Sequence, residues 1–573
     1  MRTEALIVGA GPVGLSLAIG LRLYGMSVRI VDQRHGPQTE PRAAVIWPRG
    51  AEALDDLGVG EAIRQAANEL GSLHLYSRAR HLGTAQLGRL PSAYPKPLLI
   101  EQQVTERILA ARLATLGTEV EWATTAAAIH LGSDDARATL CHAANLREET
   151  VQCAWLIGCD GAHSFVRKAL GIDFPGRPAA NLQVLQVDAV PRWRFPARRS
   201  EGYYFLARGA CLGCFPVADG AYRFFCYAHD PDPHLQQPPT ADEMRELIAG
   251  LAGAPELRLE EVSWLNRARF NTRFATQLRL GRALLAGDAA HVWPSLGGHG
   301  MNIGVQGAHN LAWKLAAVQR GRAPELLLDT YEAEERVTVT RFLQLMPLNL
   351  VERPSRLGGL LPRELALRFG LKLPGVSRII ERAASDLTVD HRHSAISQGS
   401  TRRLRRPRSR MRPYPGGRVP DAVVRLTASG ESTRLHTLLS YQRWTLVLPA
   451  GLPGPVHAQI VHALAPRRGE LQIVSVVEEA DPAAARLWLG CAQLMLVRPD
   501  RHIGLVAHRD ELARVCGYLE HWVGRAEEQG EVSCPGEAHV LAEASCAASL
   551  GTAARPLIHA QRTQCRGSNS AHV

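Results

Sequence analysis

Residues 282–315 combine a short apolar run, an acidic turn, a glycine-rich loop and a long helical pattern. The apolar residues 283–286 lie between Gly281 and Gly287, and a run this short fits a fully buried strand better than a helix. Asp288 follows at the carboxyl end of this strand, where open α/β sheets hold ligands and a carboxylate can accept hydrogen bonds from hydroxyl groups. The stretch therefore predicts an α/β fold with a ligand site at Asp288.

The loop after this turn is rich in glycine: Gly297, Gly298, Gly300 and Gly304. Because glycine lacks a side chain, a flat or bulky ligand can come close to the backbone N–H groups of such a loop. Apolar residues then recur at helical spacing from near Asn302 to Leu315, and the amino end of a helix stabilises negative charge. A flavin would fit this arrangement. Its ribityl hydroxyls would bind Asp288, and its ring, which becomes anionic on reduction, would lie against the amino end of the helix.

A second glycine pattern lies at the start of the chain. Residues 5–8 form an apolar run that predicts a strand, and a helical pattern begins at Pro12 and Val13. Between them stand three glycines in the spacing GxGxxG: Gly9, Gly11 and Gly14. In this context the spacing is typical of a turn that binds a dinucleotide: Gly9 allows a tight bend, Gly11 lets the pyrophosphate approach the backbone, and Gly14 lets helix and strand pack closely. We expect Pro12 and Val13 to bind the cofactor together with these glycines.

The next predicted strand, residues 28–31, ends at Asp32. A carboxylate at this position accepts hydrogen bonds from the ribose hydroxyls and repels a 2′-phosphate, which leaves FAD or NAD and excludes NADP at this site. Asp288 decides between the two, because a nicotinamide dinucleotide needs no distant carboxylate for a ribityl chain. FAD held between Asp32 and Asp288 is therefore the predicted cofactor.

These motifs resemble those of a known family. The sequence GRALLAGDAAH at 281–291, followed by GGHGMNIG at 297–304 and NLAWKL at 310–315, is similar to the second flavin motif of the FAD-dependent aromatic hydroxylases. These are single-component monooxygenases typified by para-hydroxybenzoate hydroxylase. The resemblance is closer to their longer relatives that act on phenols and aromatic polyketides.

The resemblance implies further residues of the cofactor site. Arg42 matches the family's arginine that reaches FAD from the loop after the second strand, and Gln102 matches its glutamine that contacts FAD before a helix. Asp160, in DGAHSFVR at 160–167, matches the family's Asp-Gly motif, which helps to bind FAD and the nicotinamide nucleotide. The glycine loop and helix start imply contacts from four more residues: Gly298, Gly300, Met301 and Asn302.

Three positions depart from the family pattern. Pro294–Ser295 stands where the family often has two prolines, and Gly307 stands where it commonly has aspartate. His299 occupies a position that varies among relatives and faces the flavin region. We consider His299 and Arg42 as candidates for a catalytic contact, with filling of the loop as the simpler alternative for His299. These departures bear on oxygen transfer and substrate class rather than on cofactor binding.

Chain length and changes in sequence pattern predict several domains, since 573 residues are too many for one hydrophobic core. Short β-type runs between Gly171 and Arg279 predict an antiparallel sheet that covers the flavin and forms the substrate pocket. Later segments resemble the thioredoxin-like C-terminal domain of the larger members, without a CxxC there. We expect a Rossmann-like FAD-binding domain at 1–175 and 270–400, an inserted substrate-binding sheet at 176–269, an Arg-rich linker at 401–414, a thioredoxin-like domain at 415–525 and a disordered tail at 526–573.

Composition excludes several classes of protein. The net charge of +11 does not indicate nucleic-acid binding, because seven arginines between 402 and 412 supply most of it and predict a solvated linker. No apolar run is long enough to cross a bilayer, and the first strand begins too close to Met1 for a signal peptide, so we expect a cytoplasmic protein without membrane contact.

Eleven cysteines are scattered without the spacing of a disulfide framework or a zinc site. Cys211 and Cys214 form a CxxC, but residues three apart in a strand point to opposite faces. We therefore expect free thiols and no metal.

By this resemblance, NADPH or NADH would reduce FAD, dioxygen would add to give a flavin hydroperoxide, and its distal oxygen would pass to an aromatic phenolic or polyketide-type substrate. Baeyer–Villiger insertion of oxygen beside a ketone is an alternative within the same chemistry. A non-catalytic escort protein like the GDP-dissociation inhibitors, which share the fold without using FAD, is an alternative from another class. Without a CxxC, the C-terminal domain would be either a structural domain or a subunit contact, and in the second case the expected assembly is a homodimer formed through it.

Overall fold

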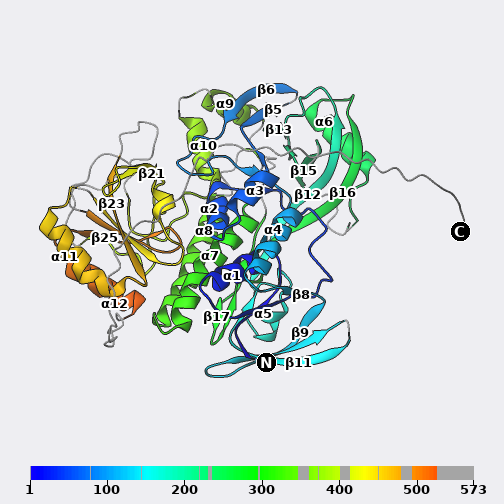
Figure 1. The fold of residues 1–573 in the computed structure, drawn as a ribbon. Helices are drawn as coiled ribbons and strands as arrows, with labels where there is room; N and C mark the ends of the chain where they lie inside the picture. The colour runs from blue at the N-terminus through cyan, green and yellow to red at the C-terminus, as the bar shows by residue number, and fades with distance from the viewer. Residues whose placement is uncertain are drawn as a thin grey trace, which may run out of the picture. The chain divides into compact units, whose positions relative to one another are not determined.

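Two eight-stranded sheets and one six-stranded sheet carry the fold in this computed structural model (Figure 1). The structure describes residues 2–524 except 78, 144, 218–219, 230–234, 236, 295–296, 346–350, 352–359, 372, 374, 401–412, 450 and 479–492. The expected Arg-rich stretch, the expected disordered tail and the departure at Ser295 lie outside the described residues.

The first eight-stranded sheet contains the glycine turn. Its main path runs in the order β17 (Arg279–Leu280), β18 (Ala283–Leu285), β11 (Arg147–Gly158), β1 (Arg2–Val8), β2 (Val28–Val31) and β8 (Val120–Glu121). The strands from β18 to β8 pair in parallel, which is the arrangement of a Rossmann-like fold. Strands β9 (Thr124–Leu131) and β10 (Ala136–His142) extend β11 as an antiparallel hairpin.

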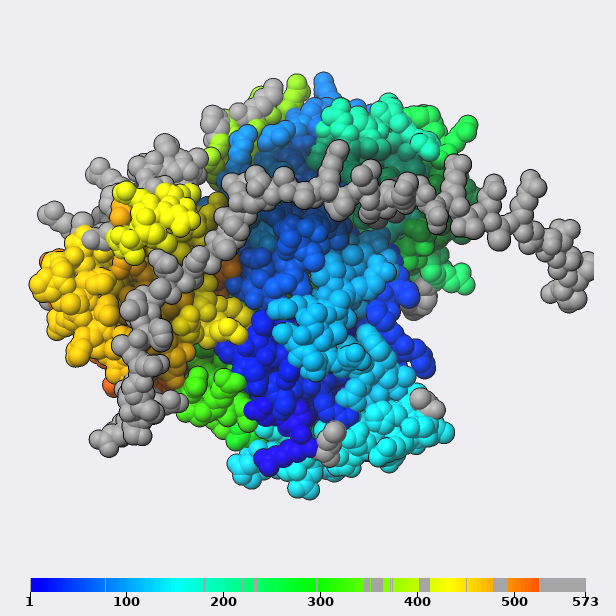
Figure 2. Space-filling model, in the orientation of Figure 1, coloured from blue at the N-terminus to red at the C-terminus, as the bar shows by residue number. Residues whose placement is uncertain are grey.

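Helices cover this parallel sheet. Helix α1 (Pro12–Leu23) packs against α4 (Gln102–Thr115) and α7 (Gly300–Gln319), and α7 lies beside α8 (Leu326–Leu345). Figure 2 shows this layer from outside, with the light-blue residues of α4 beside the dark-blue N-terminal residues. Helix α7 begins at Gly300, two residues earlier than the helical spacing predicted.

The second eight-stranded sheet is mostly antiparallel. Its order is β19 (His291–Val292), β16 (Arg258–Phe274), β12 (Gly176–Arg192), β15 (Tyr222–His229), β14 (Ala210–Pro216), β13 (Glu201–Ala207), β5 (Ser72–Ser77) and β6 (Arg80–Gln86). The sheet thus takes β5, β6 and β19 from outside the predicted range 176–269, and β5 joins β13 in parallel. Helix α6 (Ala241–Ala252) covers one face over an aromatic and aliphatic core.

The six-stranded sheet follows the expected linker. Its order is β21 (Ser432–Arg434), β20 (Val423–Leu426), β23 (Leu471–Glu478), β22 (Trp444–Pro449), β24 (Gln493–Val497) and β25 (Ile503–His508). Helices α11 (Gly454–Leu464) and α12 (Leu512–Val523) belong to the same region. Its apolar residues share a continuous core with the first sheet's helices, as shown by Trp444 and Trp313, whose ring centroids lie 5.6 Å apart.

The other elements are short. They are α2 (Pro48–Asp56), α3 (Gly60–Ala66), α5 (Phe165–Ala169), α9 (Leu360–Gly370), α10 (Val376–Ala384), the small sheet of β3 (Val45–Ile46), β7 (Leu98–Leu99) and β4 (Asn68–Glu69), and three-residue or four-residue 3₁₀ turns at Gly287–Ala289, Leu435–Leu438 and Ala465–Arg467.

Two further observations concern the described part of the chain. None of its helices combines the length and apolar character needed to span a bilayer, and none of its acidic, histidine and cysteine side chains gather in threes as metal ligands would. Cys211 and Cys214 pack into different apolar cores on opposite sides of β14, as their spacing predicted.

Candidate cofactor site

Four strand ends meet at one edge of the parallel sheet. The register places Val8 beside both Val31 and Gly158, and Gly158 beside Leu285. The residues that follow these ends therefore share that edge: Gly9, Asp32, Asp160 and Asp288. This is the edge at which open α/β sheets bind ligands, so the fold brings together residues that are far apart in the sequence.

The glycine turn leaves space on its outer side. Gly9 has a φ of +107°, and a Cβ there would collide with the carbonyl of Cys159, while a Cβ on Gly14 would collide with the carbonyl of Gly9. A Cβ on Gly11, in contrast, would meet no protein atom within 4 Å. Gly11 also precedes α1 without a side-chain cap, so the first N–H groups of the helix remain available to an anion.

Asp32 is buried at the end of β2 and holds the glycine turn. Its Oδ2 accepts the backbone N–H of Ala10 at 2.7 Å, and its Oδ1 accepts the backbone N–H of Arg34 at 2.9 Å. The guanidinium of Arg34 also pairs with this carboxylate at 3.0 Å and with Glu106 at 3.1 Å. The motif did not indicate Arg34, because its contact with Glu106 crosses 72 positions of the chain.

Asp288 lies in the 3₁₀ turn between two buried neighbours, Gly287 and Ala289. Burial raises the pKa of Asp288 above the ordinary carboxyl value, and the charges of His291 and Arg42 lower it in part. By surface area, however, the side chain is exposed. Asp288 is thus reached by solvent, and the charge of Arg42 acts on it from the loop after β2.

Asp160 caps α5 with one oxygen and leaves the other unpaired. Its Oδ2 accepts the backbone N–H of Val166 at 3.0 Å. Its Oδ1 is buried and has no hydrogen-bond partner among the described residues. A buried carboxylate oxygen without a donor is costly, so this atom fits a donor supplied by a ligand.

These features fit a bound dinucleotide that contacts one carboxylate of the protein near its pyrophosphate and a second carboxylate further along its own length. Gly11 and the start of α1 suit a pyrophosphate, and Asp32 and Asp288 lie at the same sheet edge. A family model described as FAD binding domain matches residues 2–345, and one described as aromatic-ring hydroxylase, C-terminal, matches residues 412–526. This chain belongs to the FAD-dependent aromatic hydroxylases.

Relatives of the hydroxylase match along nearly all of its length. A 12-dehydrotetracycline 5-monooxygenase/anhydrotetracycline 6-monooxygenase from Streptomyces rimosus subsp. rimosus is 32% identical over 514 residues, which are 88% of this chain and 95% of the relative. The structure of an anhydrotetracycline hydroxylase from Streptomyces rimosus is similar at a TM-score of 0.71 and 30% identity, covering 92% of this chain and 100% of that one. A ternary complex of aklavinone-11 hydroxylase with FAD and aklavinone is similar at a TM-score of 0.72 and 25% identity, covering 91% and 99%.

These findings confirm the predicted family, the α/β fold with its Rossmann-type FAD domain, and FAD as the cofactor. The hydroxylase is an FAD-dependent monooxygenase. The escort-protein alternative is therefore set aside.

The loop that carries Arg42 is held from α4. The backbone N–H of Gln102 donates to the carbonyl of Ala43 at 2.8 Å, and the backbone N–H of Ala43 donates to Oε1 of Gln102 at 3.4 Å. Arg42 itself is exposed, has a φ of +20° and pairs with Glu40 at 3.3 Å. Gln102 therefore shapes this loop, and a direct contact between Gln102 and the cofactor stays a prediction.

The glycine loop is fixed by Asn302. This buried side chain donates to the carbonyls of Val45 and Gly298, both at 3.0 Å, and its Oδ1 accepts the backbone N–H of Trp47 at 2.8 Å. Asn302 could therefore contact a cofactor only through its backbone. Gly298 has a φ of +67° and packs against Val45, whereas a Cβ on Gly300 would meet nothing within 4 Å. Met301, which follows at the start of α7, is half-buried.

His299 lies at the start of α7 among aromatic side chains. Its Nδ1 is 2.8 Å from Oδ1 of Asp386, and its ring stacks on Trp47 at 5.6 Å between centroids and lies 4.9 Å from Phe342. These contacts show that His299 packs within the loop and that its ring is held in one orientation. A direct contact of His299 or Arg42 with substrate stays a prediction.

Arg223 and Asp188 are residues of the site that the sequence did not indicate. They face each other on β15 and β12 and form a buried ion pair. Arg223 also donates to the carbonyls of Pro41 and Arg42 and lies 4.7 Å from the ring centroid of Trp264. No local pattern marks these residues, since Arg223 and Pro41 are 182 positions apart.

Proposed function

We propose that this hydroxylase oxidises a polycyclic aromatic substrate of the phenolic or polyketide type, with NADPH or NADH as reductant and dioxygen as oxygen donor. The relatives named above act, by their names, on anhydrotetracycline and aklavinone, which supports this substrate class. The observation that carries the proposal is an aromatic wall on the face of the second sheet that points toward the cofactor edge.

The direction of this face follows from Arg223. Side chains two apart in a strand share a face, so Phe225 and Tyr227 lie on the same side of β15 as Arg223. Arg223 contacts the loop at Pro41 and Arg42, which is part of the cofactor edge. The alternate residues of β15 instead pack into the core under α6: Tyr222, Phe224 and Cys226.

The wall is continuous across neighbouring strands. The rings of Phe215 and Phe225 stack with 5.5 Å between centroids and 2° between planes. Tyr204 meets Phe215 edge to face at 5.4 Å, and Tyr227 meets Phe225 in the same way at 5.5 Å. Phe215 and Phe225 are half-buried and pack partly against neighbouring apolar side chains, so we assign the part of each ring that stays exposed to a flat aromatic ligand.

FAD, when bound, supplies the electron transfer and the activation of dioxygen, which no side chain of the protein can perform. We assign Asp32 to the ribose, Gly11 and the start of α1 to the pyrophosphate, and Asp288 to the ribityl chain. The unpaired Oδ1 of Asp160 suits a donor of FAD or of the nicotinamide nucleotide. The aromatic wall orients the substrate and excludes water from the reacting atoms.

The decisive experiment uses the purified, FAD-loaded protein with a polycyclic phenol and, separately, a fused-ring ketone that lacks a phenol. We expect the phenol to stimulate NADPH or NADH oxidation and to gain one atom of ¹⁸O from ¹⁸O₂ without change in its carbon skeleton. Conversion of the ketone to a lactone, with the phenol unchanged, would instead establish the Baeyer–Villiger alternative and overturn hydroxylation.

The assembly is part of the same proposal. We infer a homodimer formed through residues 415–525, as the family resemblance implies. Sedimentation of the FAD-loaded protein at micromolar concentration tests it, and a sedimentation coefficient of a single 62.5 kDa chain would contradict it.

A further inference from the structure

Helix α2 touches the glycine loop at its amino end. Trp47, which precedes the helix, donates its backbone N–H to Asn302 and its indole N–H to the carbonyl of Gly297, both at 2.8 Å. A Cβ on Gly50, in the first turn, would collide with the amide oxygen of Asn302. The amino end of α2 therefore lies directly on the loop that the family uses to contact the flavin.

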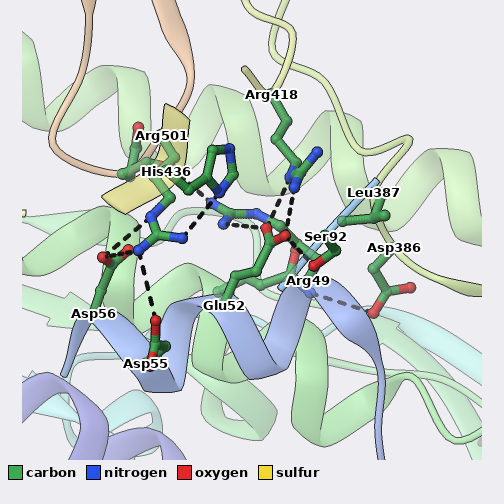
Figure 3. Close-up of polar contacts among 12 residues, drawn as sticks. Arg49, Glu52, Asp55, Asp56, Ser92, Asp386, Leu387, Arg418, His436 and Arg501 are labelled. Carbon is green, nitrogen blue, oxygen red and sulfur yellow. Dashed lines mark hydrogen bonds and ion pairs between the residues drawn. The ribbon is translucent and has the colours of Figure 1, made fainter. Parts of the chain in front are cut away.

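One face of α2 bears buried charges whose partners come from residues 413–524, which we call the C-terminal region (Figure 3). Arg49 donates to the carbonyl of Asp500 at 2.7 Å. Glu52 accepts two hydrogen bonds from Arg418, one of them at 2.7 Å. Arg49, Glu52 and Arg418 are almost fully buried, with side chains 2%, 0% and 5% exposed.

The carboxyl end of α2 is held in the same way. Asp56 pairs with Arg501 at 2.6 Å and lies 3.0 Å from Nε2 of His309 on α7. Arg501 in turn donates to Nδ1 of His436 at 3.0 Å. Figure 3 shows Glu52 and Asp56 pointing from the helix toward Arg418 and Arg501. Both ends and the middle of this face thus have partners in the C-terminal region, while His309 and Ser92 add contacts from the FAD-binding part.

Buried charges cannot lose their partners without a large penalty, so these contacts hold α2 in one position. A displaced α2 would carry Trp47 with it, and the loop at Gly297 and Asn302 would lose two donors. We propose that Arg418 and Arg501 are positioning residues for the flavin: they hold α2, and α2 holds residues 297–302 in the shape that receives FAD. This inference rests on FAD binding and is independent of the substrate class.

The test compares Arg418→Met with Arg467→Met, a matched control. Arg467 is buried to a similar degree, with a side chain 7% exposed, and within the C-terminal region it pairs with Glu470 at 3.5 Å and donates to the carbonyl of Gly524 at 2.7 Å. We expect Arg418→Met to increase amide hydrogen exchange at 297–304 in the cofactor-free protein several-fold and to weaken FAD binding about tenfold. The control should lower the thermal midpoint without either effect. Equal exchange and equal FAD affinity in the two variants would overturn the proposal.

A second variant avoids the cost of a buried unpaired charge. Trp47→Phe keeps an aromatic ring against His299 but removes the indole N–H donor to Gly297, and it leaves every ion pair of α2 intact. If α2 transmits the effect, Arg418→Met must weaken FAD binding less in the Trp47→Phe protein than in the wild type, since the two changes act in series. Strictly additive effects on FAD affinity and on the visible circular dichroism of the bound flavin would refute transmission through α2.

Discussion

Arg223 and Asp188 form a buried ion pair at 2.6 Å between Nη2 and Oδ2, and the same guanidinium donates to the backbone carbonyls of Pro41 and Arg42. One side chain of the second sheet thereby holds the loop that carries Arg42, whose charge acts on Asp288 at the edge of the first sheet. The wall that we assign to the substrate and the loop that we assign to the cofactor therefore share a rigid contact.

Replacement of Arg223 by lysine should weaken FAD binding about tenfold, equivalent to roughly 1.4 kcal/mol. Lysine keeps the positive charge but cannot bind Asp188 and two carbonyls at once, because it lacks the planar fork of donors. Isothermal titration with FAD measures the change. The control is Arg192→Lys, at an exposed pair with Glu260 on the same sheet, which should leave the affinity unchanged. Similar FAD affinities for both variants would contradict the role of Arg223.

Substitution of Gly11 by alanine should weaken FAD binding more than tenfold while leaving the unfolding temperature of the cofactor-free protein unchanged. The added methyl group meets no protein atom within 4 Å, so only an incoming pyrophosphate would be hindered. Gly454→Ala, at the start of α11, is the control because its Cβ also meets nothing. If Gly11→Ala binds FAD as tightly as this control does, the pyrophosphate is not at Gly11.

The two carboxylates should respond differently to removal of their charge. Asp288→Asn should reduce FAD affinity about 10-fold to 100-fold, since hydrogen bonds to a charged group contribute about 1.5–3 kcal/mol, and it should leave the cofactor-free protein as stable as before. Asp32→Asn should reduce both quantities, because Asp32 also binds Ala10 and Arg34. Differential scanning calorimetry and FAD titration separate these outcomes. A loss of cofactor-free stability in Asp288→Asn would show that Asp288 is a structural residue.

Acidification should destabilise the protein through His436. Burial lowers the pKa of His436 to about 4, and its Nδ1 accepts a hydrogen bond from Arg501, which only the neutral ring can do. Between pH 6.5 and pH 4 the unfolded chain takes up a proton here and the folded chain does not, so the free energy of unfolding falls as pH falls, by up to about 3 kcal/mol. Burial lowers the pKa of His391 to about 3, and this residue acts in the same direction.

Urea unfolding at pH 7 and pH 4.5 measures this loss of stability. His436→Gln, which cannot take up a proton in this range, should show a smaller loss between the two pH values than the wild type. An equal loss in both proteins would mean that His436 is not buried as a neutral ring.

The parts of the site that the sequence predicted are those with a local pattern. Gly9, Asp32 and Asp288 each follow a short apolar run, and parallel strands must present their carboxyl ends at one edge, so sequence position was enough to bring them together. The family resemblance added Arg42, Gln102 and Asp160, which no periodicity marks.

The rest depends on contacts between distant segments. Strand β5 joins β13 in parallel across about 130 positions, and β19 follows Asp288, so the predicted range 176–269 missed the strands at both edges of the second sheet. Arg418 and Glu52 are 366 positions apart, and each alone is an ordinary charged residue in a polar stretch. Such ion pairs can be recognised only in the folded structure, where both partners are buried.

Strand β19 begins at His291, three residues after Asp288, and forms one border of the second sheet, while β6 forms the opposite border. The turn that carries Asp288 is thus connected by only two residues to the border strand β19 of the second sheet. A shift of this turn when the cofactor binds should therefore reach β19 and its neighbour β16 first, and β5 and β6 last.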